Sequence, residues 1–275
     1  MSQQEAEALF AHLWKDFSRI APQAARIHDL LESRGEQFRN DHVALRTFDA
    51  EAIRKEVLAA PFIRWGYQPT GDYVFSERKL RARSYSHPSK ALPRVFISEL
   101  VLSAWSPSLQ KHIQSLVGQL PQEPDADALL GDQSLWPTVQ YSVYRELLEE
   151  SEYAAWVAAF GIRANHFTIN FNDLKTFSSL QGLNDFLVAQ GFELNSSSAP
   201  IQGSPTVLLE QSSTRADHIA WPFADGKQHM IRSCYYEFCR RYPDPKSGEW
   251  YDGFITKSAD KIFESTDVHV AARSL

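Results

Sequence analysis

One pattern occurs twice at nearly the same spacing, and it constrains this chain more than any other feature. Each copy is a histidine-led run rich in β-formers, followed by a helical stretch and then a glycine–aromatic pair. The first copy is His42–Phe48, 50–60 and Gly66-Tyr67; the second is His166–Phe171, 174–189 and Gly191-Phe192. The histidine precedes the glycine by 24 residues in the first copy and by 25 in the second. Such recurrence at a fixed offset predicts a duplicated structural unit.

More strand-like runs follow each copy. After the first they lie at 72–76, 79–84 and 95–102, and after the second at 206–211 and 229–236. Each half therefore predicts a strand–helix–strand–strand–strand module. We expect an α+β fold of two βαβββ modules, with their first strands side by side in a curved mixed sheet around a common cavity.

The modules divide the chain into five segments that we expect to form one compact domain. Helical patterns at 3–17 and 21–34 fill an N-terminal segment. The predicted segments are N-terminal helices at 1–40, a first module with its trailing helix at 41–117, a connector at 118–160, a second module at 161–243, and a C-terminal segment at 244–275. The connector is expected to contain a helix at about 145–160.

Composition excludes several classes of protein. The chain has 28 basic and 34 acidic residues and a net charge of −6, which lacks the basic footprint of a nucleic-acid binder. No apolar run approaches the roughly 20 residues of a membrane span. The polar, acidic start is unlike a targeting peptide, so we expect a cytoplasmic protein. The two cysteines, Cys234 and Cys239, cannot form a disulfide framework and are expected to be reduced.

The two histidine-led strands suggest a metal site. Alternate residues of a strand share one face, so His42 faces the same side as Arg46. Adjacent first strands would bring His42 and His166 together, and a carboxylate from a last strand would complete a facial triad. We choose Glu237, which lies in an apolar run. Two histidines and one carboxylate leave positions open for substrate and O₂ and suit non-haem Fe(II).

Other readings of the same residues remain open. Arg46 lies four residues from His42, about 13 Å along a strand, where its planar guanidinium suits the carboxylate of a short acid. It could instead pair with a surface carboxylate. Glu99 is the alternative carboxylate, and using it with Glu237 would give a His₂Glu₂ site closer to lyase or isomerase chemistry. A third possibility is a non-catalytic protein that binds a small molecule between the modules.

The sequence resembles the 2-oxoadipate dioxygenase/decarboxylase family, also called hydroxyglutarate synthases. The resemblance rests on His42–Phe48 (HVALRTF), on Asn165–Thr168 (NHFT) and on the strand that carries Glu237. It implies a vicinal-oxygen-chelate-like fold related to hydroxymandelate synthase. It also implies Fe(II) held by His42, His166 and Glu237, for which Zn, Ni or Mn can substitute in a purified sample, and an arginine, Arg46, that binds the substrate carboxylate.

The same resemblance implies a reaction. A 2-oxo diacid, 2-oxoadipate, would react with O₂ to give 2-hydroxyglutarate and CO₂, as in lysine breakdown. The expected partners are therefore the 2-oxo acid and O₂, with neither nucleic acid nor membrane. The better-known members of the family are longer than this chain and carry insertions and additional terminal segments.

Overall fold

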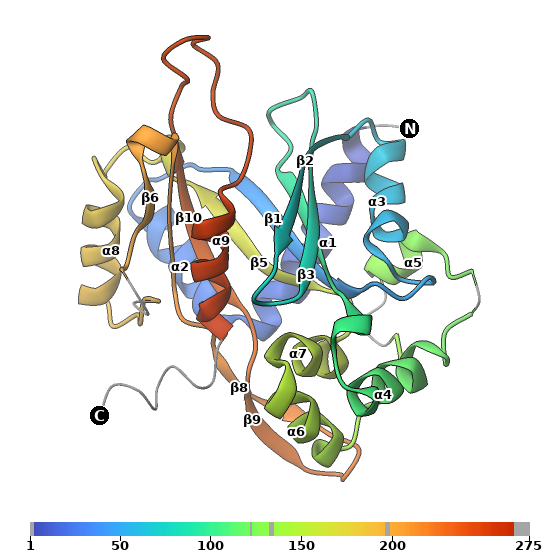
Figure 1. Ribbon diagram of the computed structural model, residues 1–275. Coiled ribbons are helices and arrows are strands. Elements are labelled where there is room, and N and C mark those ends of the chain that lie inside the picture. The colour runs from blue at the N-terminus through green and yellow to red at the C-terminus, as the bar shows by residue number, and fades with distance from the viewer. Residues whose placement is uncertain (1–2, 122, 132–134, 196–198, 267–275) are drawn as a thin grey trace.

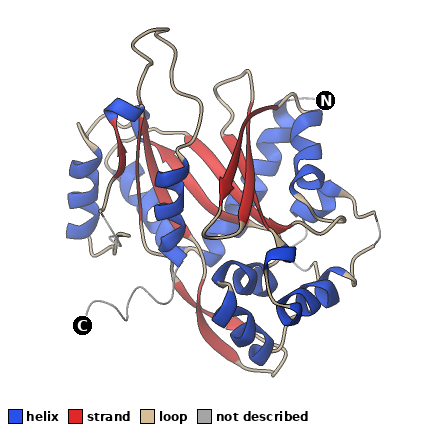
Figure 2. Cartoon of the chain, viewed as in Figure 1, coloured by secondary structure: helices blue, strands red, loops and turns tan. Residues whose placement is uncertain are grey.

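An eight-stranded mixed sheet forms the centre of the molecule (Figures 1 and 2). The computed structural model describes residues 3–121, 123–131, 135–195 and 199–266. The strands lie in the order β2-β3-β4-β1-β5-β10-β7-β6. Their bounds are β1 Asn40–Phe48, β2 Gln68–Phe75, β3 Leu80–Ser86, β4 Arg94–Leu100, β5 Ala164–Asn170, β6 Gln202–Ser204, β7 Leu209–Ser213 and β10 Tyr235–Arg241.

The sheet consists of two halves with the same strand order. In each half the first strand pairs in parallel with the last one, β1 with β4 and β5 with β10, and the other two strands continue outward. The halves meet where β1 pairs with β5 in antiparallel orientation. This arrangement confirms the predicted α+β fold of two βαβββ modules, and it places the two histidine-led strands next to each other.

The two faces of the sheet are covered differently. Helices α1 (Gln3–Ile20) and α2 (Pro22–Ser33) pack behind β5 and β10, and α9 (Thr256–Phe263) crosses the front (Figure 1). On the back face, rings of α1 contact rings of the central strands, for example Phe17 with Phe167 at 5.1 Å. This buried aromatic layer leaves the front face of β1, β5 and β10 for the cavity under α9.

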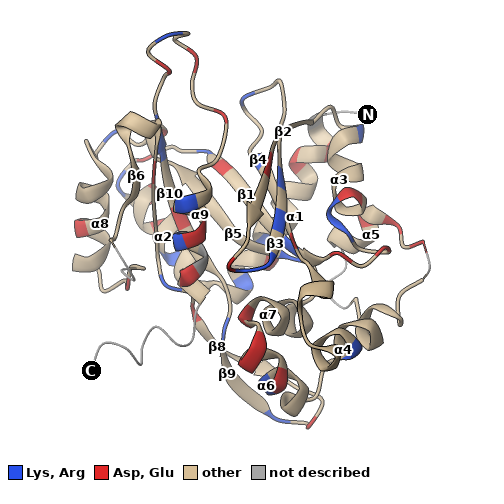
Figure 3. Cartoon of the chain, viewed as in Figure 1, with Lys and Arg blue, Asp and Glu red and all other residues tan. Residues whose placement is uncertain are grey.

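The remaining helices surround the sheet. They are α3 Lys55–Arg64, α4 Pro107–Val117, α5 Ala126–Gly131, α6 Tyr141–Glu150, α7 Glu152–Phe160 and α8 Leu180–Ala189. Basic and acidic residues are interspersed along the elements in view (Figure 3), in keeping with the small net charge. Among the described residues, no helix is both long and apolar enough to span a bilayer.

Several helix boundaries differ from the sequence prediction. The helix predicted at 50–60 begins only at Lys55. The buried carboxylate of Glu99, on strand β4, accepts the Lys55 N–H at 3.0 Å and so caps the start of α3. The helix predicted at 145–160 is two helices, since the Ser151 hydroxyl accepts the Ala154 N–H at 3.1 Å and starts α7 afresh. The helix predicted from 174 starts at Leu180, where Ser179 provides the cap.

The second module also contains an insertion. The strand predicted at 229–236 is broken between β9 (Gln228–Arg232) and β10, and β9 pairs with β8 (His218–Pro222) in a separate hairpin. The hairpin extends away from the main sheet beside α6 (Figure 1). Of the predicted C-terminal segment, 267–275 lies outside the described residues.

Candidate metal centre

Three buried side chains meet on the front face of the three central strands. His42 comes from β1, His166 from β5 and Glu237 from β10. The Nε2 atom of His42 lies 3.6 Å from Glu237 Oε1, and that of His166 lies 3.3 Å from Glu237 Oε2. One ligand atom from each residue lies within 4.8 Å of the other two. The three side chains expected to bind metal are therefore together, at most 5% exposed.

The strand register explains why these side chains converge. His42 pairs with Thr168, and Thr168 pairs with Glu237, so these three residues form one row across the sheet. His166 lies in the next row, where it pairs with Ala44 on one side and Tyr235 on the other. Paired residues in adjacent strands point to the same face, so both imidazoles and the carboxylate face the cavity.

The second ring nitrogen of each histidine is also engaged. Asp41 Oδ1 lies 2.8 Å from His42 Nδ1, and Asn165 Oδ1 lies 3.2 Å from His166 Nδ1. An acceptor at Nδ1 favours the tautomer whose Nε2 lone pair faces the cavity, the usual arrangement around metal-binding histidines. Both rings therefore present Nε2 to the space beside Glu237.

Asp41 is itself fixed by two arginines. Arg241 donates to its carboxylate at 2.7 and 2.9 Å, and Arg94 donates at 3.1 Å. Burial alone would raise the pKa of Asp41, but Arg241, His42 and Arg94 hold that pKa well below its usual range. The residue that orients His42 therefore carries a full negative charge.

The electrostatics of the three side chains fit a divalent cation. Burial, together with His42 and Arg46, lowers the pKa of His166 well below its usual value, which keeps the imidazole neutral and able to donate its lone pair. Burial raises the pKa of Glu237, so its negative charge carries a cost that a bound cation would remove. Gln211 Nε2 donates to Glu237 Oε1 at 2.6 Å and orients the carboxylate. Two imidazole nitrogens and one carboxylate form the donor set of a facial triad.

The cavity at this centre is small and mostly apolar in its remaining walls. Besides the three candidate ligands and Gln211, it is lined by Phe96, Tyr235, Phe254, Ala259 and Ile262. Its volume is about 20 Å³, roughly the space of one water molecule. Ala259 and Ile262 belong to α9, which Arg78 holds through an ion pair with Asp260 at 2.8 Å. A short diacid can enter only if this roof moves.

Arg46 is buried near this cavity, not at the surface. Its guanidinium lies 4.9 Å from the Tyr153 ring centroid and 5.2 Å from that of Trp156. Nη2 donates to Thr266 at 3.1 Å, and Nη1 lies 3.6 Å from Glu152. Its side chain is 2% exposed, so the surface ion pair considered from the sequence is wrong. Among the described residues Arg46 does not line the cavity itself, and a substrate carboxylate would have to compete with Glu152 for it.

The alternative carboxylate, Glu99, lies on the opposite face of the sheet. It pairs with Thr47, so both residues point away from the face that carries Arg46. Its carboxylate accepts from Lys55 Nζ at 2.7 Å and lies 3.2 Å from Arg81. The alternative His₂Glu₂ set is therefore not formed by Glu99. The register assigns Phe96 as the counterpart of Glu237: each is paired with the residue two positions beyond its module's histidine.

Several residues that shape the centre were missed in the sequence. Asp41 and Asn165 could have been identified from the sequence, because each directly precedes one of the paired histidines and each carries a side-chain oxygen. No sequence pattern identifies Gln211, Phe254 or the residues of α9 that cover the cavity. The ring of Phe254 lies edge-on to His42 at 4.8 Å, yet its segment has no counterpart in the first module.

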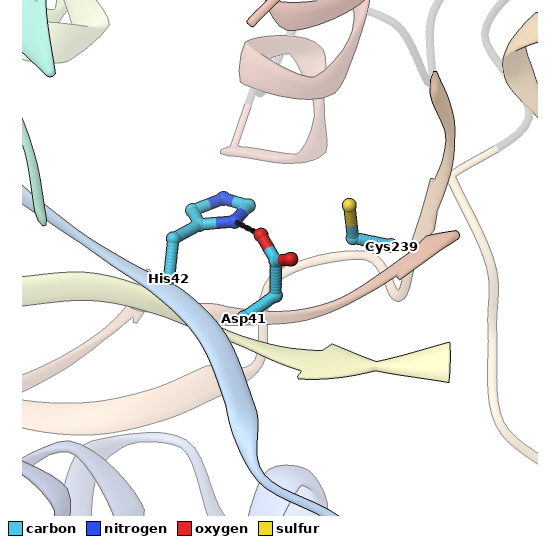
Figure 4. A group of neighbouring side chains, drawn as sticks. All are labelled: Asp41, His42 and Cys239. Carbon is cyan, nitrogen blue, oxygen red and sulfur yellow. Dashed lines mark hydrogen bonds and ion pairs between the residues drawn. The ribbon is translucent and has the colours of Figure 1, made fainter. Parts of the chain in front are cut away.

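A second cluster of possible ligands lies behind His42. Figure 4 shows the Asp41 carboxylate between the His42 ring and the Cys239 thiol. Two arginines already occupy this carboxylate, and burial raises the pKa of Cys239 well above its usual value, so the thiol stays protonated. These charges and protons favour a structural role for this cluster over a second metal site.

Comparison with known proteins agrees with this geometry. A model of the 2-oxoadipate dioxygenase/decarboxylase family matches residues 11–123 and 121–243 of this chain. The chain belongs to this family. The 2-oxoadipate dioxygenase/decarboxylase of Oryza sativa subsp. japonica, a chloroplastic/amyloplastic protein, is 36% identical over 270 residues, which cover 89% of this chain and 74% of the rice protein.

Two solved structures are similar over nearly all of the chain. The hydroxyglutarate synthase of Oryza sativa in complex with 2-oxoadipate is 32% identical, with a TM-score of 0.92 over 99% of this chain and 96% of that chain. A Shewanella frigidimarina protein that carries the provisional name of a hydrolase is 46% identical, with a TM-score of 0.84 over 91% and 98% of the two chains. This likeness to a hydroxyglutarate synthase structure, together with the two paired βαβββ modules of the sheet, confirms the predicted vicinal-oxygen-chelate-like fold.

Proposed function

We propose that this protein is an Fe(II)-dependent dioxygenase/decarboxylase that converts 2-oxoadipate and O₂ to 2-hydroxyglutarate and CO₂, a step of lysine breakdown. The observation that carries the proposal is the convergence of two histidine Nε2 atoms and one carboxylate in a buried centre. Membership in the 2-oxoadipate dioxygenase/decarboxylase family supports the substrate class.

In this proposal His42, His166 and Glu237 hold the metal. Bound Fe(II) would supply adjacent open positions at which a 2-oxo acid and O₂ bind together. The overall reaction balances, because a six-carbon 2-oxo diacid and O₂ contain the same atoms as a five-carbon 2-hydroxy diacid and CO₂. Both oxygen atoms of O₂ end in the two products.

The protein's own residues would orient the reactants and exclude water. Asp41 and Asn165 fix the histidine rings, and Gln211 holds one oxygen of Glu237 so that the other faces the cavity. Phe96 and Phe254 present apolar surface around the centre, which limits competing reactions with water.

Arg46 would bind the second carboxylate of the substrate. Its planar guanidinium can bind a carboxylate through two hydrogen bonds, and the rings of Tyr153 and Trp156 hold it in place. Entry of the substrate would displace α9, which now closes the cavity over the three candidate ligands.

The test is anaerobic loading with Fe(II), followed by addition of 2-oxoadipate and O₂. We expect one O₂ consumed and one CO₂ released for each 2-hydroxyglutarate formed. An Arg46→Lys variant provides the matched control: it should bind Fe(II) as the wild type does, yet its KM for 2-oxoadipate should rise by about tenfold or more, because Lys lacks the bidentate geometry.

Two outcomes would contradict the proposal. If the iron-loaded protein consumes no O₂ with any 2-oxo acid, the oxygenase activity is wrong. If it then hydrolyses a substrate without O₂, its activity agrees with the provisional name of the Shewanella relative instead. Turnover of a 2-oxo acid other than 2-oxoadipate would retain the chemistry and correct the substrate.

A further inference from the structure

Two adjacent tyrosines on β10 bury their hydroxyl groups without any hydrogen-bond partner among the described residues. Tyr235 and Tyr236 are both 0% exposed, and neither phenolic oxygen has a partner. Because consecutive strand residues face opposite sides of a sheet, the two rings lie in different surroundings. Tyr236 packs on the back face against Trp14 and Phe17 of α1. Tyr235 lines the cavity of the candidate metal centre.

An unpartnered hydroxyl in the interior lowers stability, because the group gives up its hydrogen bonds to water. The cost is typically about 1–3 kcal/mol, so each such group calls for an explanation. Tyr236 is packed against the rings of Trp14 and Phe17. Tyr235 lines the metal cavity, where a ligand can reach it.

Along the strands, Tyr235 lies between the row of His42 and Glu237 and the position of Arg46. His42, Thr168 and Glu237 form one row across the sheet. Tyr235 lies in the next row, with Ala44 and His166. Arg46 follows two residues after Ala44 on the same face of β1. Along the strand axis, Tyr235 is therefore offset from Glu237 in the same direction as Arg46 is offset from His42.

The ring of Tyr235 is held in place by one of the candidate metal ligands. It stacks on the ring of His166, with centroids 4.6 Å apart and planes at 25°. A phenol hydroxyl can donate one hydrogen bond, so Tyr235 presents a fixed donor to the cavity that it lines.

We propose that the Tyr235 hydroxyl donates a hydrogen bond to the distal carboxylate of a bound 2-oxo diacid and selects, together with Arg46, for a substrate with a second carboxylate. This inference rests on the proposed function. The 2-oxo acid end of the substrate is held in the row of His42 and Glu237. The part that extends past Tyr235 toward Arg46 is the carbon chain, whose only oxygens belong to the distal carboxylate.

In the first module, the same position holds a residue that binds other side chains of the protein. The counterpart of Tyr235 is Arg94, since each pairs with its module's histidine across a parallel pair of strands. Arg94 binds Asp41 and Asp252, so its polar atoms are satisfied by the protein. Tyr235 is the member of this pair whose polar atom is left for a ligand.

The experiment compares Tyr235→Phe with Tyr236→Phe, which makes the same chemical change one residue away on the other face. In the metal-free protein, neither variant should unfold at a lower temperature than the wild type, because each loses only an unpartnered hydroxyl. Calorimetric binding to the Fe(II)-loaded protein without O₂ then compares 2-oxoadipate with 2-oxohexanoate, which has the same chain length and no second carboxylate.

We expect Tyr235→Phe to bind 2-oxoadipate about tenfold more weakly than the wild type, since a hydrogen bond to a charged group is lost. It should bind 2-oxohexanoate as the wild type does, and Tyr236→Phe should match the wild type with both acids. Equal affinities of Tyr235→Phe and wild type for 2-oxoadipate would overturn the inference and leave the proposed function intact.

Two other results would also overturn it. An equal loss of affinity for both acids would mean that Tyr235 acts at the metal end of the substrate. A lower unfolding temperature for Tyr235→Phe would mean that the hydroxyl has a partner within the protein. If the wild type binds neither acid, the proposed function fails and this inference fails with it.

Discussion

The two modules share one strand order but make unequal contributions to the centre they enclose. Each provides a histidine from its first strand, and each histidine contacts the side chain of the residue before it. From there the modules differ at every matched position of the register. The first has Asp41, Arg46, Arg94 and Phe96 where the second has Asn165, Asn170, Tyr235 and Glu237.

This division shows how a duplicated fold can form an asymmetric site. Two matched carboxylates would surround a metal from both sides and leave few open positions. With Phe96 opposite Glu237, the first module instead presents an apolar wall to the centre. The first module instead has a carboxylate beside its histidine, Asp41, which binds Arg94 and Arg241.

The largest expected effect comes from comparing the two glutamates. Glu237→Gln removes the only carboxylate among the three candidate ligands and should lower the affinity for Fe(II) by about 100-fold or more. Glu99→Gln should retain stoichiometric metal, yet lose about 2 kcal/mol of unfolding free energy, because Lys55 and Arg81 lose a buried partner. Metal competition against a coloured chelator, with denaturant unfolding, measures both. Loss of metal in Glu99→Gln would contradict our assignment of the two carboxylates.

The next effect comes from exchanging the residues that hold the two histidines. Asp41→Asn should weaken Fe(II) binding by about tenfold, because a charged acceptor makes the imidazole a better donor than an amide does. Asn165→Asp should act in the opposite direction and strengthen binding severalfold. The same chelator competition measures both affinities. If Asp41 acts only by holding the ring of His42 in position, both variants should weaken Fe(II) binding. The charge of Asp41 would then not distinguish the two modules.

The smallest expected effect concerns the hairpin that only the second module has. Asp217, just before β8, accepts the Gln23 N–H at the start of α2 at 3.0 Å, and burial raises its pKa to about 6. A carboxyl whose pKa is raised by folding stabilises the protein below its unfolded pKa, and this stability is lost as the pH rises through about 6.

Asp217→Asn should therefore be more stable than the wild type at pH 8, by about 1 kcal/mol after allowance for partial exposure to solvent. The two proteins should converge between pH 6 and pH 4, and denaturant unfolding at several pH values measures the difference. A constant difference at all pH values would show that Asp217 does not titrate in this range.

The strand pattern allowed much of the fold and part of the centre to be predicted from the sequence. Strand parity requires His42 and Arg46 to share a face, and the repeat places the strands of His42 and His166 side by side. The same parity rules out the alternative carboxylate, Glu99: it lies three residues beyond Phe96, an odd offset that turns its side chain to the other face. A carboxylate within an apolar run does not by itself show which face of the strand it occupies. The pairing of residues between neighbouring strands does show it.

Features that depend on contacts between distant segments could not be predicted in this way. The start of α3 is set by Glu99 on β4, and no local signal at residues 50–54 identifies that partner. The roof over the centre comes from α9, whose sequence gives no indication of the surface that it covers.

The position of that roof along the chain has a consequence for biosynthesis. The candidate ligands all occur by residue 237, whereas the roof begins at Thr256. During synthesis on the ribosome, the three side chains can therefore converge before the helix that covers them has been made. The centre is closed only when α9 has been synthesised and packs on the front of the sheet.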